Sequence, residues 1–394
     1  MREARKSTTE RQAAASRLHR YLVERHLRGH NLVGPDPGIR LNYRFGRFFK
    51  SAVPGLPWND DMIYLQGQGY WILSNLRLAT LHRGTAEHAS FADLAKAAAE
   101  GIVELQDHDG GWPYPNPEWK GRVANAEGTW AAIGLLAAYR HGGESRFLEA
   151  ALKWHEYVLA QVGFQRVNAT SAVNYFANRT GPRVPNNTAF YLRFLAELAD
   201  VTGDSGYLGE SRALLAFLED VIKPTGEFPY TVEGETPGRI RDHFQCYQYN
   251  AFMALDLFHF ARLTAAEAAR DLAMRTIHFL ETGQNPSGRV AYSCDEHYRT
   301  VTYHSAVVAA AFHVAGELGD PRLAGLSARG YDYVVKQQRA DGGLPHSLGD
   351  YRILADRRSY PRYLTMICYH LLEPASLATD GREAAATEVS NTHV

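Results

Sequence analysis

The sequence has few cysteines, no excess of charge of either sign and no long apolar run. Its 394 residues include three cysteines and no CxxC pair, so neither a disulfide framework nor a zinc site is expected. The 42 basic and 43 acidic side chains nearly cancel, which disfavours a protein built around nonspecific nucleic-acid binding. No stretch is long enough for a membrane span, and the first residues lack the apolar segment of a secretion signal. These absences predict a soluble, cytoplasmic protein.

What the chain does have is an alternation of two kinds of helical segment. One kind is amphipathic, with apolar residues spaced by three and four, as in 91–106 and 145–162. The other kind is apolar almost all round, as expected of buried helices. The buried segments begin near residues 68, 127, 187, 249, 304 and 360, at intervals of 55 to 62 residues. This period indicates a repeat of six helical hairpins.

The two ends of the repeat complement each other. An amphipathic helix at about residues 10–28 can serve as the outer partner of the sixth buried helix. We therefore expect an all-α fold, an (α/α)6 toroid, with an open solenoid as the alternative. In this arrangement residues 1–30 form the helix that closes the ring, 31–375 form the toroid and 376–394 form a disordered tail. Strand signals are weak and limited to short pieces such as 226–232.

The links that lead into the buried helices are long and chemically rich. They contain roughly 20 to 30 residues, many of them Gly, Pro, Tyr, His, Asp and Arg, and all should emerge at the same end of the ring. Long ordered loops in a compact domain are usually functional. Tyrosine outnumbers phenylalanine by 22 to 17, and most tyrosines fall in these links or just after them. We predict a site at this mouth, with aromatic surfaces that also form hydrogen bonds.

Three junctions between a helix and the following loop share one pattern. The segment 106–112 (QDHDGGW) is matched by 338–344 and more loosely by 284–290. These junctions resemble the QW motif of the squalene–hopene cyclase and protein prenyltransferase superfamily, which implies the toroid. In such a junction glycine ends the helix in a left-handed turn, and glutamine can cap the last helical carbonyls. The acidic DxDD proton donor of the cyclases and the zinc ligands of the prenyltransferases have no counterpart at the expected spacing.

A second resemblance covers residues 58–140. The strings WNDD (58–61), QGQGY (66–70), WPYPNP (112–117) and EGTW (127–130) follow one another. Their order is similar to that in the toroid domain of glucuronyl carbon-5 epimerases, where a QGQG segment opens a barrel helix. The Asn-Gly pair that usually opens the next helix in that family is Glu-Gly here, and the Glu-Glu-Tyr-Pro loop reads Gly-Trp-Pro-Tyr. The resemblance implies a polysaccharide groove across the mouth of a toroid.

Several candidate residues have both a functional and a structural interpretation. Asp61 suits acid–base work or hydroxyl binding, or else caps the first buried helix. Glu127 faces the mouth, or else pairs with the dipole of its own helix. Tyr249 begins a buried helix where a core position would favour Phe or Leu. Tyr303 and His304 suit proton transfer better than metal binding, because no metal-binding spacing is present.

The arginines near the mouth are candidates for holding a carboxylate. Arg358 and Arg362 lie in the last link, where a guanidinium could bind a uronate in a bidentate manner. The structural alternative is an ion pair between Asp356 and Arg358 that fastens the ring where it closes. Arg239 and Arg241 precede the fourth buried helix, and their alternative is a solvated loop.

The sequence thus predicts an enzyme that acts on a uronate-containing glycan or its lipid-linked precursor. It would abstract the proton next to the carboxylate, leading to epimerisation or elimination. The predicted catalytic residues are Tyr249, Tyr303, His304, Arg358 and Asp61. The predicted substrate-binding residues are Trp58, Gln68, Trp112, Tyr114, Glu127, Tyr230, His243, Tyr360 and Arg362. Neither a metal nor another cofactor is expected, and a homodimer is compatible with the sequence.

Other function classes stay open at this point. A glycoside hydrolase would need two carboxylates at glycosidase spacing, chosen from Asp61, Glu127, Asp295 and Asp356. An isoprenoid cyclase would enclose a deep apolar chamber whose aromatic faces stabilise cations. A glycan-binding toroid without catalytic activity is the remaining alternative. The polarity of the cavity discriminates between a carbohydrate and an isoprenoid.

Overall fold

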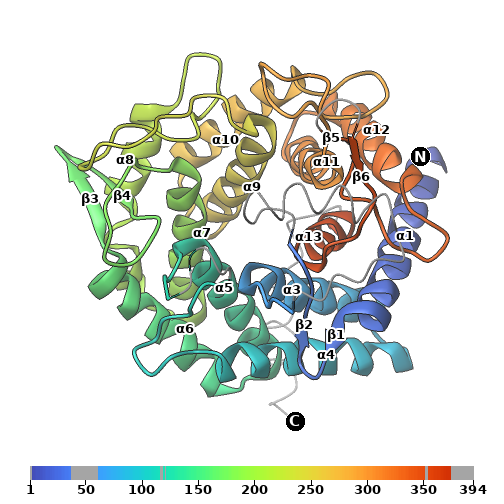
Figure 1. The fold of residues 1–394 in the computed structure, drawn as a ribbon, viewed down its shortest axis with the longest axis horizontal. Helices are drawn as coiled ribbons and strands as arrows, with labels where there is room; N and C mark the ends of the chain where they lie inside the picture. The colour runs from blue at the N-terminus through green and yellow to red at the C-terminus, as the bar shows by residue number, and fades with distance from the viewer. Residues whose placement is uncertain (1, 37–60, 116–118, 120, 351–353, 374–394) are drawn as a thin grey trace, which may run out of the picture.

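Helices alternate between an inner and an outer ring around one axis (Figure 1). The computed structural model describes residues 2–36, 61–115, 119, 121–350 and 354–373. Within these ranges there are twelve α-helices. The predicted all-α fold of six hairpins is therefore confirmed. The predictions for Trp58 and for the tail at 376–394 lie outside the described residues.

The inner and outer helices have the characters that the sequence assigns to them. The inner helices are α3 (Leu65–Leu81), α5 (Asn125–Gly142), α7 (Pro185–Thr202), α9 (Cys246–Thr264), α11 (Thr302–Glu317) and α13 (Pro361–Leu371). The outer helices are α1 (Arg2–His26), α4 (Ala86–Glu104), α6 (Ser145–Tyr157), α8 (Ser211–Val221), α10 (Glu267–Glu281) and α12 (Leu323–Lys336). A π-helical turn, η2 (Val158–Val162), extends α6, and a 3-10 turn, η3 (Ser205–Leu208), precedes α8. None of the described helices is both long and apolar enough to cross a bilayer.

The loops contain short antiparallel hairpins. They pair β1 (Leu27–Arg28) with β2 (Asn31–Leu32), β3 (Phe164–Val167) with β4 (Thr170–Val173), and β5 (Ser347–Asp350) with β6 (Leu354–Asp356). The weak strand signal at 226–232 corresponds to a single bridge between Val232 and Arg183. The backbone N–H groups of Tyr230 and Thr231 donate to Asp242 and Arg241 in the loop before α9, so no regular ladder forms.

Left-handed glycines fit against the neighbouring outer helix at four junctions around the ring. Their φ angles lie between 85° and 93°, and an added Cβ would come within 1.9–2.6 Å of a carbonyl oxygen of that helix. The contacts join Gly110 to Lys153 of α6, Gly226 to Arg275 of α10, Gly288 to Arg329 of α12 and Gly342 to Arg17 of α1. Three of these glycines belong to the QW-like junctions, and Gly226 adds a junction that the motif does not reveal.

The glutamine of each QW-like junction spans the same boundary. The side-chain amide of Gln106 donates to the carbonyl of Ala150 in α6, at 3.0 Å. Gln284 reaches α12 in the same way, and Gln338 donates to Ala14 of α1 at 2.9 Å, which closes the ring. The prediction that glutamine caps its own helix is wrong. After α4, for example, backbone N–H groups already occupy the last helical carbonyls, so the amide bonds to the next hairpin.

Replacing a junction glycine tests how much this contact contributes. Gly288 and Gly84 share a φ of 85°, but nothing lies within 4 Å of a Cβ at Gly84. We expect Gly84→Ala to lower the free energy of unfolding by about 1 kcal/mol, the cost of a left-handed alanine. Gly288→Ala should cost about 3 kcal/mol, because the backbone of α12 must also shift. Urea unfolding of the two variants measures the difference, and equal losses would contradict the proposed role of the junction.

Candidate active site

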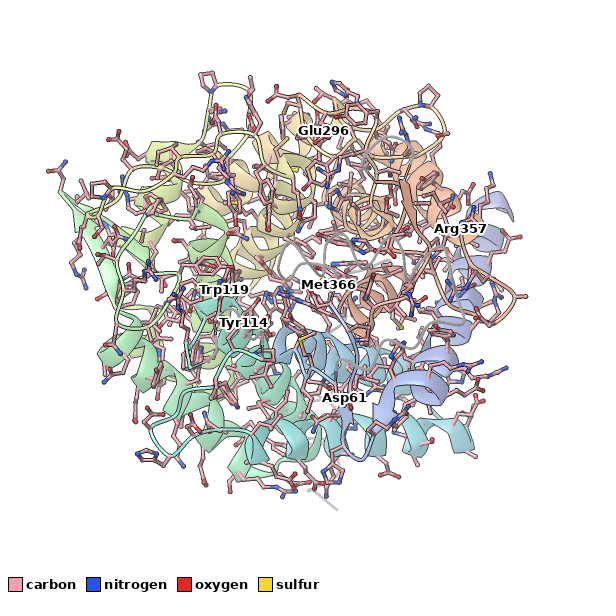
Figure 2. All side chains as sticks on the ribbon, in the orientation of Figure 1. Asp61, Tyr114, Trp119, Glu296, Arg357 and Met366 are labelled. Carbon is pink, nitrogen blue, oxygen red and sulfur yellow. The ribbon has the colours of Figure 1, made fainter. Side chains whose placement is uncertain are left out.

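The inner helices enclose a cavity of about 480 Å³ at the end of the ring where these helices begin. Each of the six inner helices contributes at least one residue to the wall. The aromatic lining residues are Tyr64, Tyr114, Trp119, Trp130, Tyr175, Phe190, Tyr230, Phe244, Tyr249, Phe252, Tyr303 and Tyr363. The polar ones are Asp36, Gln66, Asn186, Asn187, Arg241, Gln245, Gln248, Asp256 and Arg362. Figure 2 shows Tyr114, Trp119 and Met366 near the centre of the ring.

Arg362 and Glu127 form a buried ion pair beside the cavity. Arg362 Nη2 lies 2.9 Å from Glu127 Oε1 and 2.7 Å from Gln66 Oε1, and Nη1 lies 3.7 Å from Asp36 Oδ2. The other oxygen of Glu127 accepts the backbone N–H of Gln66 at the start of α3. Burial raises the pKa of Glu127, although Arg362 opposes the shift. Glu127 thus fixes Arg362 and the first turn of α3, and does not itself line the cavity.

Arg241 is a better placed cation for a negatively charged ligand than Arg362. Two carboxylates already flank Arg362, whereas Arg241 has no ion-pair partner among the residues that the structure describes. The Arg241 guanidinium lies 4.8 Å from the centre of the Phe244 ring. Its backbone N–H donates to Thr231 Oγ1 at 2.7 Å, which holds the loop in place. Arg241 therefore presents to the cavity a positive charge that no described carboxylate pairs with.

Asp256 supplies a titratable carboxyl group that sequence reasoning missed. It lies two turns along α9 from Tyr249 and is buried. Its Oδ1 is 3.3 Å from Nη1 of Arg193. Burial raises the pKa of Asp256 to about 7, against the opposing effect of Arg193. An acidic residue in the apolar middle of an inner helix is the sequence signal that could have revealed it.

Buried ion pairs fill the ring axis beyond Asp256. Arg193 also contacts Glu197 at 3.3 Å, and Arg77 pairs with Glu373 at 2.8 Å. A small space of about 10 Å³ lies beside them, between side chains that include Tyr70 and Trp130. Asp256 therefore lies at the floor of the cavity.

Tyrosine hydroxyl groups line the walls as hydrogen-bond donors. Tyr303 donates to Gln245 Oε1 at 3.2 Å, and the ring of Tyr249 lies 4.9 Å from that of Tyr230. Burial raises the pKa of Tyr249 and of Tyr303 well above the usual value. Both residues are therefore protonated at neutral pH, which suits the role of a general acid.

Two buried amide side chains on α7 and α9 line the cavity with polar atoms that bond to no described residue. Both polar side-chain atoms of Asn187, and Oε1 of Gln248, have no hydrogen bond to any described residue. Asn187 is 1% exposed and Gln248 is 3% exposed. A buried polar group left unpaired costs about 1–3 kcal/mol. A ligand with hydroxyl groups would remove this cost.

Three predicted catalytic residues lie away from the cavity. His304 is buried behind the rings of Tyr292 and Tyr303, and burial lowers its pKa to about 3. Arg358 follows β6, where its backbone N–H donates to Asp356. Asp61 is exposed before α3. None of the three is a lining residue, whereas Tyr249 and Tyr303 are.

The predicted binding residues divide in the same way. Tyr114, Tyr230 and Arg362 line the cavity. Four others make structural contacts: Gln68 bonds to both backbone groups of Leu32, Trp112 donates to the carbonyl of Ile102, Tyr360 donates to Asp356, and His243 bonds to Glu227.

The fold resembles that of several carbohydrate enzymes of known structure. A cellobiose 2-epimerase from Bacillus thermoamylovorans superimposes with a TM-score of 0.65 and 16% identity, over 84% of this chain and 100% of that one. A family 76 mannosidase from Bacteroides thetaiotaomicron gives 0.66 and 12%, over 93% and 98%. A family 88 glycosyl hydrolase from Bacteroides vulgatus gives 0.59 and 11%, over 85% and 96%. No family model and no curated protein matches the chain. At these identities the likeness establishes the (α/α)6 toroid.

Neutralising Glu127 tests its structural role. In Glu127→Gln the buried Arg362 loses one of its two carboxylates, so we expect the free energy of unfolding to fall by about 3 kcal/mol. Asp61→Asn removes an exposed carboxylate and should change it by less than about 0.5 kcal/mol. Chemical denaturation at pH 7 compares the two variants. Equal stability of Glu127→Gln and the wild type would show that the ion pair does not support the fold.

Proposed function

We propose that this chain is a carbohydrate-active enzyme that moves a proton on a uronate-containing glycan or its lipid-linked precursor, as an epimerase or a lyase. The observation that carries the proposal is the composition of the axial cavity. It combines the carboxyl group of Asp256, whose pKa burial raises to about 7, with the cation of Arg241, which has no described ion-pair partner. Tyrosines and the amides of Asn187 and Gln248 line the same cavity.

The walls suit a sugar in size and chemistry. Aromatic rings such as those of Tyr64 and Tyr114 offer faces on which the C–H surface of a pyranose packs. The amides of Asn187 and Gln248 offer donors and acceptors to hydroxyl groups. A volume of about 480 Å³ falls within the range of small-molecule sites, about 300–1,000 Å³.

The proposed reaction begins at the carbon next to the carboxylate. Arg241 binds the uronate carboxylate and offsets the charge that accumulates there when the C–H bond breaks. The Asp256 carboxylate accepts the proton, and the electron pair moves into the carboxylate as an enolate. In epimerisation a tyrosine, Tyr249 or Tyr303, returns a proton to the opposite face. In elimination the tyrosine protonates the departing oxygen while a carbon–carbon double bond forms.

The rival functions have less support. An isoprenoid chamber would be apolar, but two arginines and two aspartates line this cavity. Hydrolysis by the carboxylates considered from the sequence lacks support as well, because none of Asp61, Glu127, Asp295 and Asp356 lines it. The structural neighbours include a cellobiose 2-epimerase and a mannosidase, which supports a carbohydrate substrate.

Isotope exchange tests the proton transfer. When the wild type acts on a panel of uronate glycans in deuterated water, it should place deuterium at the carbon next to the carboxylate or yield an unsaturated product. Asp256→Asn should reduce the rate at least 100-fold, because it cannot accept the proton. The exposed Asp295→Asn is the matched control and should retain wild-type activity. Neither label nor unsaturation with any glycan would contradict both reactions.

The pH profile adds a second readout to this experiment. A base acts in its ionised form, so the rate should rise as the pH increases through about 7 and then level off. A rate that falls over this interval would assign Asp256 the role of an acid instead.

Charge removal tests the recognition of the carboxylate. Arg241→Gln should lower kcat/KM on a uronate glycan at least 100-fold, since it removes both the binding charge and the stabilisation of the enolate. Arg239→Gln alters an exposed arginine two residues earlier and should have no effect. The measurement is kcat/KM of the two variants. An unchanged kcat/KM for Arg241→Gln would exclude Arg241 as the partner of the substrate carboxylate.

A further inference from the structure

Four side chains of metal-ligating type converge beside the cavity. They are Glu227, His243, Cys246 and Cys294, and their ligand atoms all lie within 4.8 Å of one another. We propose that this cluster, the Cys2HisGlu cluster, is a structural zinc site. The proposal is independent of the reaction proposed above, because none of the four residues lines the cavity.

The spacing of the ligand atoms approaches that of a tetrahedral site. Glu227 Oε1 lies 2.8 Å from His243 Nδ1 and 3.8 Å from Cys294 Sγ, and the two sulfur atoms are 3.0 Å apart. Zinc bonds of about 2.0–2.3 Å give tetrahedral edges of about 3.3–3.8 Å. Shifts of less than 1 Å in these side-chain atoms would therefore admit the ion.

The fold brings the ligands together from three places. Glu227 and His243 belong to the segment between α8 and α9, Cys246 is the first residue of α9, and Cys294 lies in the link between α10 and α11. Between His243 and Cys246, Gln245 adopts a left-handed conformation with φ of 47°. Such backbone strain in a non-glycine residue is found where surrounding interactions impose it.

Neighbouring charged side chains orient the two ligands that are not thiols, Glu227 and His243. Lys223 Nζ lies 3.0 Å from Oε2 of Glu227, which leaves Oε1 facing the cluster. On the outer side of His243, Nε2 lies 3.5 Å from Asp242 Oδ2. A carboxylate behind a ligating histidine is a common outer shell of zinc sites, where it fixes the tautomer.

The donor set favours zinc over a simple pair of thiols. Two sulfurs, one imidazole and one carboxylate provide four protein ligands, the number typical of a closed structural zinc site. The alternative for two sulfurs this close is a disulfide, which would prevent zinc binding and is therefore an outcome of the test.

The zinc would hold the cavity wall in place. The segment between α8 and α9 carries Tyr230 and Arg241 to the cavity, and its last residue, Gln245, lines the cavity as well. Gln245 in turn donates to the hydroxyl of Tyr292 in the neighbouring link, at 2.8 Å. A metal that joins Cys246 to Cys294 would lock these two links together at the same place.

The test measures metal binding directly. Protein purified under reducing conditions without chelators should contain about one zinc per chain by elemental analysis. After chelator treatment, cobalt(II) alone should restore a tetrahedral visible spectrum with a thiolate-to-metal absorption in the near ultraviolet. Cys294→Ser and His243→Ala should weaken cobalt binding at least 10-fold. His297→Ala, an exposed histidine of the same link, is the matched control and should bind as the wild type does.

Each contrary result overturns the proposal. Reduced wild-type protein that neither retains zinc nor develops the cobalt spectrum would refute it without reference to any variant. A cobalt spectrum that is unchanged in Cys294→Ser would place the metal elsewhere. A disulfide between Cys246 and Cys294, detected by mass spectrometry in the reduced and zinc-supplemented preparation, would replace the metal with a covalent link.

Discussion

The ring depends on the fit of a left-handed glycine turn against the backbone of the next outer helix. Only glycine can adopt this conformation while its α-carbon approaches a carbonyl so closely. The glutamine amides of the QW-like junctions fasten the same boundary with a hydrogen bond. Because one such junction joins α12 to α1, closure uses the same contacts as the repeat itself. This geometry fixes four of the six boundaries between neighbouring outer helices.

The charged residues around the cavity have two different uses. At the mouth, Glu127 and Asp36 flank Arg362 and fix the start of α3, so this arginine serves the scaffold. Arg241 and Asp256 are instead the residues of the proposed chemistry. Arg241 is a cation with no ion-pair partner among the described residues, and the pKa of the Asp256 carboxyl group is raised to about 7. The same residue types therefore build the wall and supply the proposed chemistry, and the difference lies in the partners that each one has.

The sequence predicts the fold better than the site because the fold follows a period. The intervals between buried segments give six hairpins, and the first turns of inner helices place Tyr249 and Tyr303 at the cavity. The prediction that His304 lies in the site did not account for the helix geometry. Consecutive helical residues point about 100° apart, so His304 faces away from the cavity when Tyr303 faces it. Asp256 lies two turns further along its helix than Tyr249, whereas the sequence pattern indicated only residues in the first turn of each inner helix. The approach of Cys294 to Cys246 arises only when two links fold together.

The filled axis below Asp256 restricts how a polymer can use this ring. Among the described residues, ion pairs such as Arg193 to Asp256 and Arg77 to Glu373 lie across the far end of the ring, so the cavity is closed on that side. Under the proposed function, a glycan strand would then not thread through the ring. The reacting sugar would be a chain end that enters the cavity, or a residue bent inward from a strand lying across the mouth. The product would leave by the same opening, so successive turnovers along one strand would require release and rebinding.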